Sequence, residues 1–165
     1  MNLRALSLSV VLALCAGCAV PPAKRVDASS AEFPAVPTEA LNLDVRQETI
    51  QQTICVPGYT DSVRPSTSYT TGVKAKLLRE RAQTVLAASN YELDHKVPLA
   101  LRGHPRNLSN LELQLWEGEA GAKKKDRLER RLQVLVCGGK VGLRAAQQAM
   151  YFDWQAAYRE YLIHR

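Results

Sequence analysis

The chain has 165 residues, enough for one domain with a modest hydrophobic core, and this length argues against two domains. Lys and Arg together number 22 against 16 Asp and Glu, which gives a formal charge of +6. This excess favours an acidic partner such as nucleic acid or anionic lipid, although many secreted proteins without such a partner carry a similar charge.

The first 18 residues resemble the signal peptide of a bacterial lipoprotein. Arg4 precedes an apolar run over residues 5–14, which is too short for a stable transmembrane helix and typical of a secretory leader. The run ends in Leu-Cys-Ala-Gly-Cys, so the resemblance implies cleavage before Cys18 and a lipid on its thiol. Ordinary signal cleavage near Ala19 is the alternative. We expect an exported protein of the cell envelope, which a lipid on Cys18 would anchor to the membrane, facing the periplasm or the outside.

Residues 19–44 are rich in Pro, Ala and Ser and show no apolar period. We therefore expect a flexible tether there, followed by one folded domain over residues 45–165. Export places the remaining cysteines, Cys55 and Cys137, in an oxidising compartment, and neither has the close neighbours that a zinc site needs. We predict a disulfide between them, which would close a loop of roughly 80 residues and stabilise the fold by about 4 kcal/mol.

Apolar periodicity predicts three helices and two strands in the folded domain. Apolar side chains at helical spacing predict helices over residues 73–88, from about 120 to 137, and over 143–163. Apolar runs over residues 91–101 and 111–116 predict two strands, and the residues between them are rich in turn formers. The expected fold class is α+β, with a strand–loop–strand–helix unit in the middle of the chain.

The first predicted strand carries Asp94 next to His95, and neighbours on a strand point to opposite faces. Hydrolysis of a phosphodiester needs a nucleophilic water, a base that takes its proton, and a cation that offsets charge on the leaving oxygen. A neutral imidazole is a suitable base near neutral pH, and a carboxylate is a hard ligand for a divalent cation such as Mg²⁺. Asn110, at the return of the loop, has donors and acceptors that can pin the loop backbone and keep the strands in register.

These residues resemble the HNH endonuclease motif. The likeness rests on Asp-His-Lys-Val-Pro-Leu at 94–99, on Gly103 and on Asn110. The chain also resembles small secreted bacterial members of this family from about residue 47 to residue 161. The resemblance implies a ββα-metal (His-Me finger) core, a two-stranded hairpin plus a helix, with additional flanking helices. It also implies His95 as the general base, Asp94 as a ligand of a divalent metal such as Mg²⁺, and Asn110 as the structural asparagine.

The chain departs from this family at two positions. A His or Asn should face the metal from the helix after the second strand, but residues 117–125 contain neither. Glu119 or Glu117 could supply an oxygen ligand instead, or water could complete the shell. The second departure is Arg102, which stands where the family more often has a glycine before Gly103.

Four cationic residues are candidates for binding the phosphates of a nucleic acid: Arg64, Arg102, Lys123 and Lys125. The alternative for a charge run on a surface helix is that it is merely solvated, and Arg64 could instead form a structural ion pair. We expect a metal-dependent endonuclease that hydrolyses DNA or RNA with low sequence specificity, because no base-reading element is evident. The alternative is a catalytically degenerate member of the fold, kept as a nucleic-acid-binding or structural lipoprotein.

Overall fold

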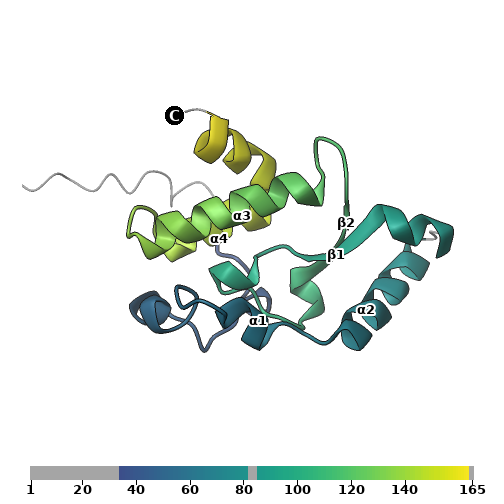
Figure 1. The fold of residues 1–165 in the computed structure, drawn as a ribbon, viewed down its shortest axis with the longest axis horizontal. Coiled ribbons are helices and arrows are strands. Elements are labelled where there is room, and N and C mark those ends of the chain that lie inside the picture. Colours follow the sequence, from purple (N-terminus) through teal and green to yellow (C-terminus); the bar gives the residue numbers. More distant parts are fainter. Residues whose placement is uncertain (1–33, 82–84, 164–165) are drawn as a thin grey trace, which may run out of the picture.

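The computed structural model describes residues 34–81 and 85–163 (Figure 1). The predicted leader, the predicted lipidation site Cys18 and the predicted tether up to residue 33 lie outside these residues. Among the helices of the two described ranges, none combines the length and the apolar character needed to cross a membrane.

An antiparallel hairpin of two strands lies in the middle of the fold. Strand β1 (Tyr91–His95) pairs with β2 (Leu111–Leu115), and Asp94 lies opposite Glu112. The first strand ends at residue 95 rather than 101, because a 3-10 turn that begins after Pro98 replaces the extended chain. Helices and one small sheet together confirm the α+β class.

Helix α2 (Thr67–Glu80) packs against both strands of the hairpin. It begins before the predicted start at residue 73, because the Ser66 hydroxyl accepts a hydrogen bond from the Tyr69 amide and caps the helix. A separate 3-10 helix, η3 (Val85–Asn90), leads into β1. The single helix expected over residues 73–88 is therefore wrong in its bounds.

Helices α3 (Ala122–Cys137) and α4 (Leu143–Tyr158) pack against each other on the other side of the hairpin from α2 (Figure 1). The predicted last helix is interrupted at Asp153, which has non-helical backbone angles. Its carboxylate accepts a hydrogen bond of 2.8 Å from the Ala156 amide and so caps a new helical segment. The chain then continues as a π-helix, η6 (Arg159–Ile163).

The main hydrophobic core lies between α3, α4 and the segment that follows β1. Its fully buried members include Ile54, Val97, Leu101, Leu128, Leu132 and Val136. The predicted disulfide is present: Cys55, just before helix α1 (Tyr59–Val63), is bonded to Cys137 at the end of α3. This bond closes the core at the end of α3 where the chain turns toward α4.

Residues 34–44, which we placed in the tether, pack on the folded domain. Val36 and Ala40 are buried in the core, and Leu41 forms a β-bridge with Gly103. Burial of these apolar side chains stabilises the packed segment despite its proline-rich composition. The domain boundary expected at residue 45 is therefore too late.

Candidate active site

The His95 side chain lies at the end of β1, next to the loop that leads to β2. Its Nε2 is 3.1 Å from the carbonyl oxygen of Pro105. Because a carbonyl can only accept, Nε2 must carry the hydrogen, and the lone pair is left on Nδ1. Within the described part of the chain, no group donates a hydrogen bond to that nitrogen. Nδ1 is therefore the atom that can take a proton.

Burial lowers the pKa of the His95 imidazole. The hydrogen bond to Pro105 and the charge of Asp94 act in the opposite direction, and the cations Arg64 and Lys125 add to the lowering. The ring is thus neutral near pH 7, which is the form required of a general base.

Asn110 fixes the loop that carries Pro105. Its fully buried amide accepts a hydrogen bond of 2.8 Å from the Val97 amide and donates to the carbonyls of Val97 and His104, each at 3.0 Å. His104 directly precedes Pro105 in the chain. Asn110 therefore positions the carbonyl that orients the His95 ring, and its contacts are those expected of a structural asparagine.

Gly103 allows the loop to pass close to the end of β1. A Cβ at this position would lie 1.7 Å from the Val97 carbonyl oxygen and 2.8 Å from Nδ2 of Asn110. Arg102, one residue earlier, has a φ of 74°, in the left-handed region that favours glycine. Its Nε donates a hydrogen bond of 2.8 Å to the Asn42 carbonyl, so Arg102 holds the N-terminal segment and does not face His95.

Asp94 points to the opposite face of β1 from His95, as the alternation of side chains along a strand requires. Its Oδ2 accepts a hydrogen bond of 2.7 Å from Nζ of Lys125, and its Oδ1 accepts one of 2.7 Å from the His95 amide. The same Nζ donates to the His95 carbonyl at 2.8 Å and lies 3.5 Å from a carboxylate oxygen of Glu112. Only 2% of the Lys125 side chain is exposed, so the phosphate contact predicted for it is wrong.

The residues around Asp94 do not form a set of metal ligands. In residues 34–81 and 85–163, no three His, Cys, Asp or Glu side chains meet at one point. Glu117 pairs with Lys123, and Glu119 pairs with Lys124 at 2.6 Å, both at the solvent-exposed surface. The group of α3 that contacts Asp94 is the ammonium of Lys125, which has no lone pair to offer a metal. The predicted Mg²⁺ site with Asp94 and Glu119 therefore does not fit the residues present.

A cleft of about 340 Å³ opens beside the free edge of β1, and we call it the His95 cleft. The polar and aromatic residues that line it include Arg64, Thr67, Lys74, Glu92, Asp94, His95 and Trp116. Neither Arg64 nor Lys74 forms an ion pair with a carboxylate in the described part of the chain. Two cations in a cleft with a neutral imidazole can bind a phosphate group.

Lys74 is a cationic site residue that the sequence analysis missed, and Trp116 is another lining residue outside the predicted set. Thr67, Thr70, Thr71 and Lys74 are spaced by three, four and seven residues along α2, so they share one face of this helix. All four line the His95 cleft. The signal was a polar stripe at helical spacing, hidden among the other charged residues of the same helix.

Three carboxyl groups, those of Glu92, Asp126 and Glu129, have pKa values raised by burial and by the charge of Asp94. Burial raises the pKa of Glu92 to about 7, and repulsion from Asp94 and Asp126 adds to the effect. Burial likewise raises the pKa of Glu129 to about 7, with the same two carboxylates contributing. Arg64 and Lys125 partly offset both shifts. One carboxyl oxygen of Glu92 is buried and has no hydrogen-bond partner, which is consistent with a neutral acid.

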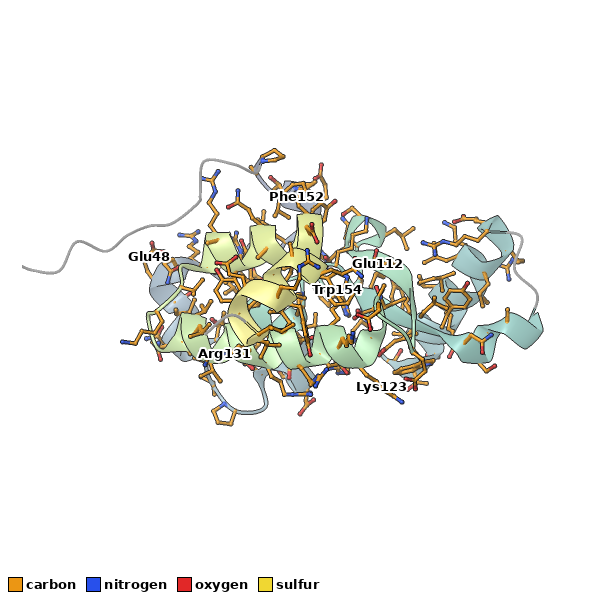
Figure 2. All side chains as sticks on the ribbon, turned by 90° about the horizontal axis from the view of Figure 1, so that it is seen from above. Glu48, Glu112, Lys123, Arg131, Phe152 and Trp154 are labelled. Atoms are coloured by element: carbon orange, nitrogen blue, oxygen red, sulfur yellow. A yellow bond between two sulfur atoms is a disulfide. The ribbon has the colours of Figure 1, made fainter. Side chains whose placement is uncertain are left out.

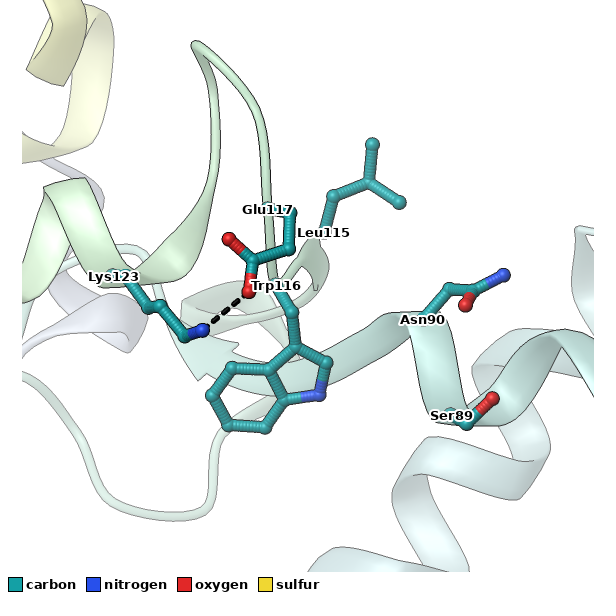
Figure 3. Close-up of a pocket in the computed structure, with 6 residues that line it drawn as sticks. All are labelled: Ser89, Asn90, Leu115, Trp116, Glu117 and Lys123. Atoms are coloured by element: carbon teal, nitrogen blue, oxygen red, sulfur yellow. Dashed lines mark hydrogen bonds and ion pairs between the residues drawn. The ribbon is translucent and has the colours of Figure 1, made fainter.

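A second depression adjoins the cleft through Trp116. It measures about 470 Å³, and its lining includes Ser89, Asn90, Trp116 and Lys123. Figure 3 shows the indole ring of Trp116 between Lys123 on one side and Ser89 and Asn90 on the other. Lys123 lies at the outer edge of the molecule, whereas Glu112 lies nearer its centre (Figure 2). Of the four predicted phosphate contacts, Arg64 lines the cleft itself and Lys123 lines this neighbouring depression.

Comparisons with known proteins found no matching family model, no similar curated protein and no similar solved structure. The functional inference therefore depends on the geometry of the His95 cleft.

Proposed function

We propose that this protein hydrolyses phosphodiester bonds of DNA or RNA in the His95 cleft, with low sequence specificity. The observation that carries this proposal is the His95 ring itself. Its Nε2 is committed to the Pro105 carbonyl, which leaves the lone pair on Nδ1, and two cations without an ion-pair partner in the described residues, Arg64 and Lys74, line the same cleft. A base and an anion-binding pair in one cleft are the parts that attack on a phosphate diester requires.

The reaction can be written with groups of this chain and water. Nδ1 of His95 takes a proton from a water molecule while the oxygen of that water forms a bond to phosphorus. The bond between phosphorus and the leaving oxygen then breaks, and that oxygen takes a proton from water in the open cleft. Arg64 and Lys74 offset the charge that builds up on the phosphoryl oxygens. The protonated ring afterwards releases its proton to solvent.

Low sequence specificity follows from the kind of contacts that the site offers. Arg64 and Lys74 would contact phosphate oxygens, which are the same at every nucleotide. Trp116, between the cleft and its neighbouring depression, offers a flat ring on which any base can stack. We therefore propose single-stranded or locally opened nucleic acid as the preferred substrate.

A second candidate function is binding of nucleic acid without hydrolysis. It is favoured by the departure at Lys125, which takes the place in which a metal ligand was expected from the helix. In that case the cleft would hold phosphates by Arg64 and Lys74, and His95 would serve only to keep the loop in place.

Location at the cell envelope is part of the same proposal and is supported by the sequence of residues 1–18. Mass spectrometry of protein expressed in a bacterium with a lipoprotein pathway would test it. A lipid on Cys18 that is lost in Cys18→Ala is the expected result, and an unmodified N-terminus near Ala19 would show ordinary secretion instead.

The enzymatic proposal is tested with purified protein on end-labelled single-stranded and double-stranded DNA and RNA, with different divalent metals and with a chelator. We expect cleavage by the wild type and a loss on the order of 100-fold or more in His95→Ala. Lys74→Ala and Lys76→Ala form a matched pair on α2, since Lys76 instead pairs with Glu80. Equal cleavage by wild type and His95→Ala would contradict the enzymatic proposal. Binding without cleavage in all conditions would favour the second candidate.

A further inference from the structure

We infer that the ammonium of Lys125 is the resident cation of this site, so that the His95 cleft neither binds nor needs a divalent metal ion. The claim that catalysis needs no divalent metal rests on the proposed function. The claim that the site binds none does not.

The ammonium occupies a cage of oxygens. Nζ of Lys125 is 2.7 Å from a carboxylate oxygen of Asp94, 2.8 Å from the His95 carbonyl oxygen and 3.5 Å from a carboxylate oxygen of Glu112. An ammonium has three hydrogens to donate, and three oxygens from the two strands surround it. These are the kinds of oxygen that would otherwise hold a hard cation.

The burial of Lys125 shows that this contact is built into the fold. The side chain is 2% exposed, and a buried lysine is rare unless it is paired. Lys125 lies near the N-terminus of α3, where the helix dipole disfavours a cation. Its neighbours Lys123 and Lys124 point to solvent-exposed glutamates, so only Lys125 is held by the hairpin.

A divalent ion has no place beside this group. It would have to bind Asp94 next to a fixed positive charge, or displace an ammonium that is shielded from water. Repulsion between like charges in a partly buried site opposes the first route, and the loss of buried ion pairs opposes the second. Glu117 and Glu119, the oxygens expected to complete a metal shell, are engaged at the surface by Lys123 and Lys124.

In the catalytic cycle Lys125 acts as a positioning residue. It does not line the His95 cleft, but it holds the His95 carbonyl and the Asp94 carboxylate at the end of β1, from which the base emerges. Its fixed positive charge also stabilises negative charge near the cleft, as a metal ion would. A change at Lys125 should therefore alter the metal dependence of the protein and not only its stability.

The test measures Mn²⁺ binding by calorimetry and by thermal unfolding, independently of activity, in wild type, Lys125→Asn and Lys125→Gln. We expect no binding by the wild type. Removal of the ammonium frees the carboxylates of Asp94 and Glu112, so the variants should gain a site, with a rise in Tm of about 5 °C at Mn²⁺ roughly tenfold above its Kd. The gain should disappear in Lys125→Asn/Asp94→Asn, and Lys124→Asn is the matched control that should behave like wild type.

Stoichiometric Mn²⁺ binding by the wild type that is lost in Asp94→Asn would overturn the inference. So would the absence of any gain in both lysine variants, provided that at least one of them folds; if neither folds, the wild-type titration alone decides. Cleavage by the wild type should be unchanged by a chelator. If no form of the protein cleaves nucleic acid, the proposed function fails while the Mn²⁺ titrations still decide the identity of the cation. If cleavage strictly requires an added metal that the wild type binds, the function stands and this inference fails.

Discussion

Nδ2 of Asn110 donates to the carbonyl oxygen of His104, the residue before the one whose carbonyl orients the His95 ring. The two carbonyls belong to consecutive peptide units that meet at Pro105, whose ring fixes φ, so the buried amide and the candidate base are coupled through one short stretch of backbone. The stability of the loop and the geometry of the base therefore depend on the same side chain.

Replacement of Asn110 by Ala should destabilise the protein by about 3 kcal/mol or more, because it leaves the amide and carbonyl of Val97 and the carbonyl of His104 buried without partners. Chemical denaturation gives the free energy of unfolding. Asn107→Ala is the matched control in the same loop, where the lost bond to the Ser109 amide caps one short turn and costs about 1 kcal/mol. Equal losses in the two variants would contradict the role given to Asn110.

Gly103→Ala should be among the most damaging single substitutions in the chain. The added Cβ would lie 1.7 Å from the Val97 carbonyl oxygen, so the loop must move and the Asn110 contacts must break, at a cost of about 3 kcal/mol or more. Gly72→Ala, in helix α2, is the control. A Cβ there meets nothing within 4 Å, and the helix gains about 0.5 to 1 kcal/mol. Thermal unfolding of the pair should therefore show shifts of opposite sign.

Glu129→Gln should change how stability depends on pH. The pKa of Glu129 is about 7 in the folded protein against 4.5 when unfolded, so between these values the folded state binds more protons than the unfolded state. Stability therefore falls as pH rises through this window, because the partly buried carboxyl must ionise. The variant has no such group, and its advantage over wild type should grow from pH 5 to pH 8 by on the order of 1 to 3 kcal/mol. An advantage that stays constant with pH in urea titrations would show that Glu129 does not titrate in this window. Glu80→Gln, at an exposed position on α2, serves as the control.

Lys74→Ala should weaken binding of single-stranded DNA and reduce its salt dependence. Each phosphate contact contributes roughly 0.7 to the slope of log K against log salt for a single strand, so the slope should fall by about that amount. Lys76→Ala, on the same helix but outside the His95 cleft, should leave the slope unchanged. Fluorescence anisotropy at several salt concentrations measures both, and a slope reduced equally by the two variants would place the nucleic acid elsewhere.

Nucleic acid in the cleft should quench the fluorescence of Trp116. The indole is 36% exposed and lines both depressions, and stacking of a base on it is worth about 1 to 3 kcal/mol. The second tryptophan, Trp154, packs against the core, so Trp154→Phe isolates the Trp116 signal. Quenching by an oligonucleotide that persists in Trp116→Phe would exclude a stacking role for Trp116.

Local patterns in the sequence predicted much of the fold. The hairpin, the helix after it and the Cys55–Cys137 disulfide follow from alternation, helical spacing and a pair of cysteines in a chain that we expected to be exported. The helix bounds were less predictable, because a hydroxyl cap at Ser66 and an aspartate cap at Asp153 override apolar periodicity. The packing of residues 34–44 could not be predicted, since the contacts that hold them are made by residues distant in the chain.

The candidate site was predicted in part. Asp94, His95 and Asn110 lie within one short stretch; the loop contacts of Asn110 agree with residue type, the metal-ligand role expected of Asp94 does not fit its pairing with Lys125, and the role of His95 as a base stays a prediction. Lys125 was misread as a surface charge, although it shares the helical stripe of Leu128, Leu132 and Val136, all of them buried. A lysine on an apolar stripe can extend its long side chain to solvent, or it can pair with a buried acidic group. Only the fold shows that Lys125 pairs with Asp94.

The bridge between Leu41 and Gly103 has a mechanical consequence. The Asn42 amide bonds to the Arg102 carbonyl and the His104 amide to the Ala40 carbonyl, each at 2.8 Å, so the N-terminal segment is fastened directly to the loop beneath His95. Tension applied to the chain ahead of Pro34, as in a protein held at one end by a surface, would first load the hydrogen bond from Gln148 of α4 to the Pro34 carbonyl and would then reach this loop. Once the bond at Pro34 gives way, the two backbone bonds would carry the load into the loop that orients the His95 ring.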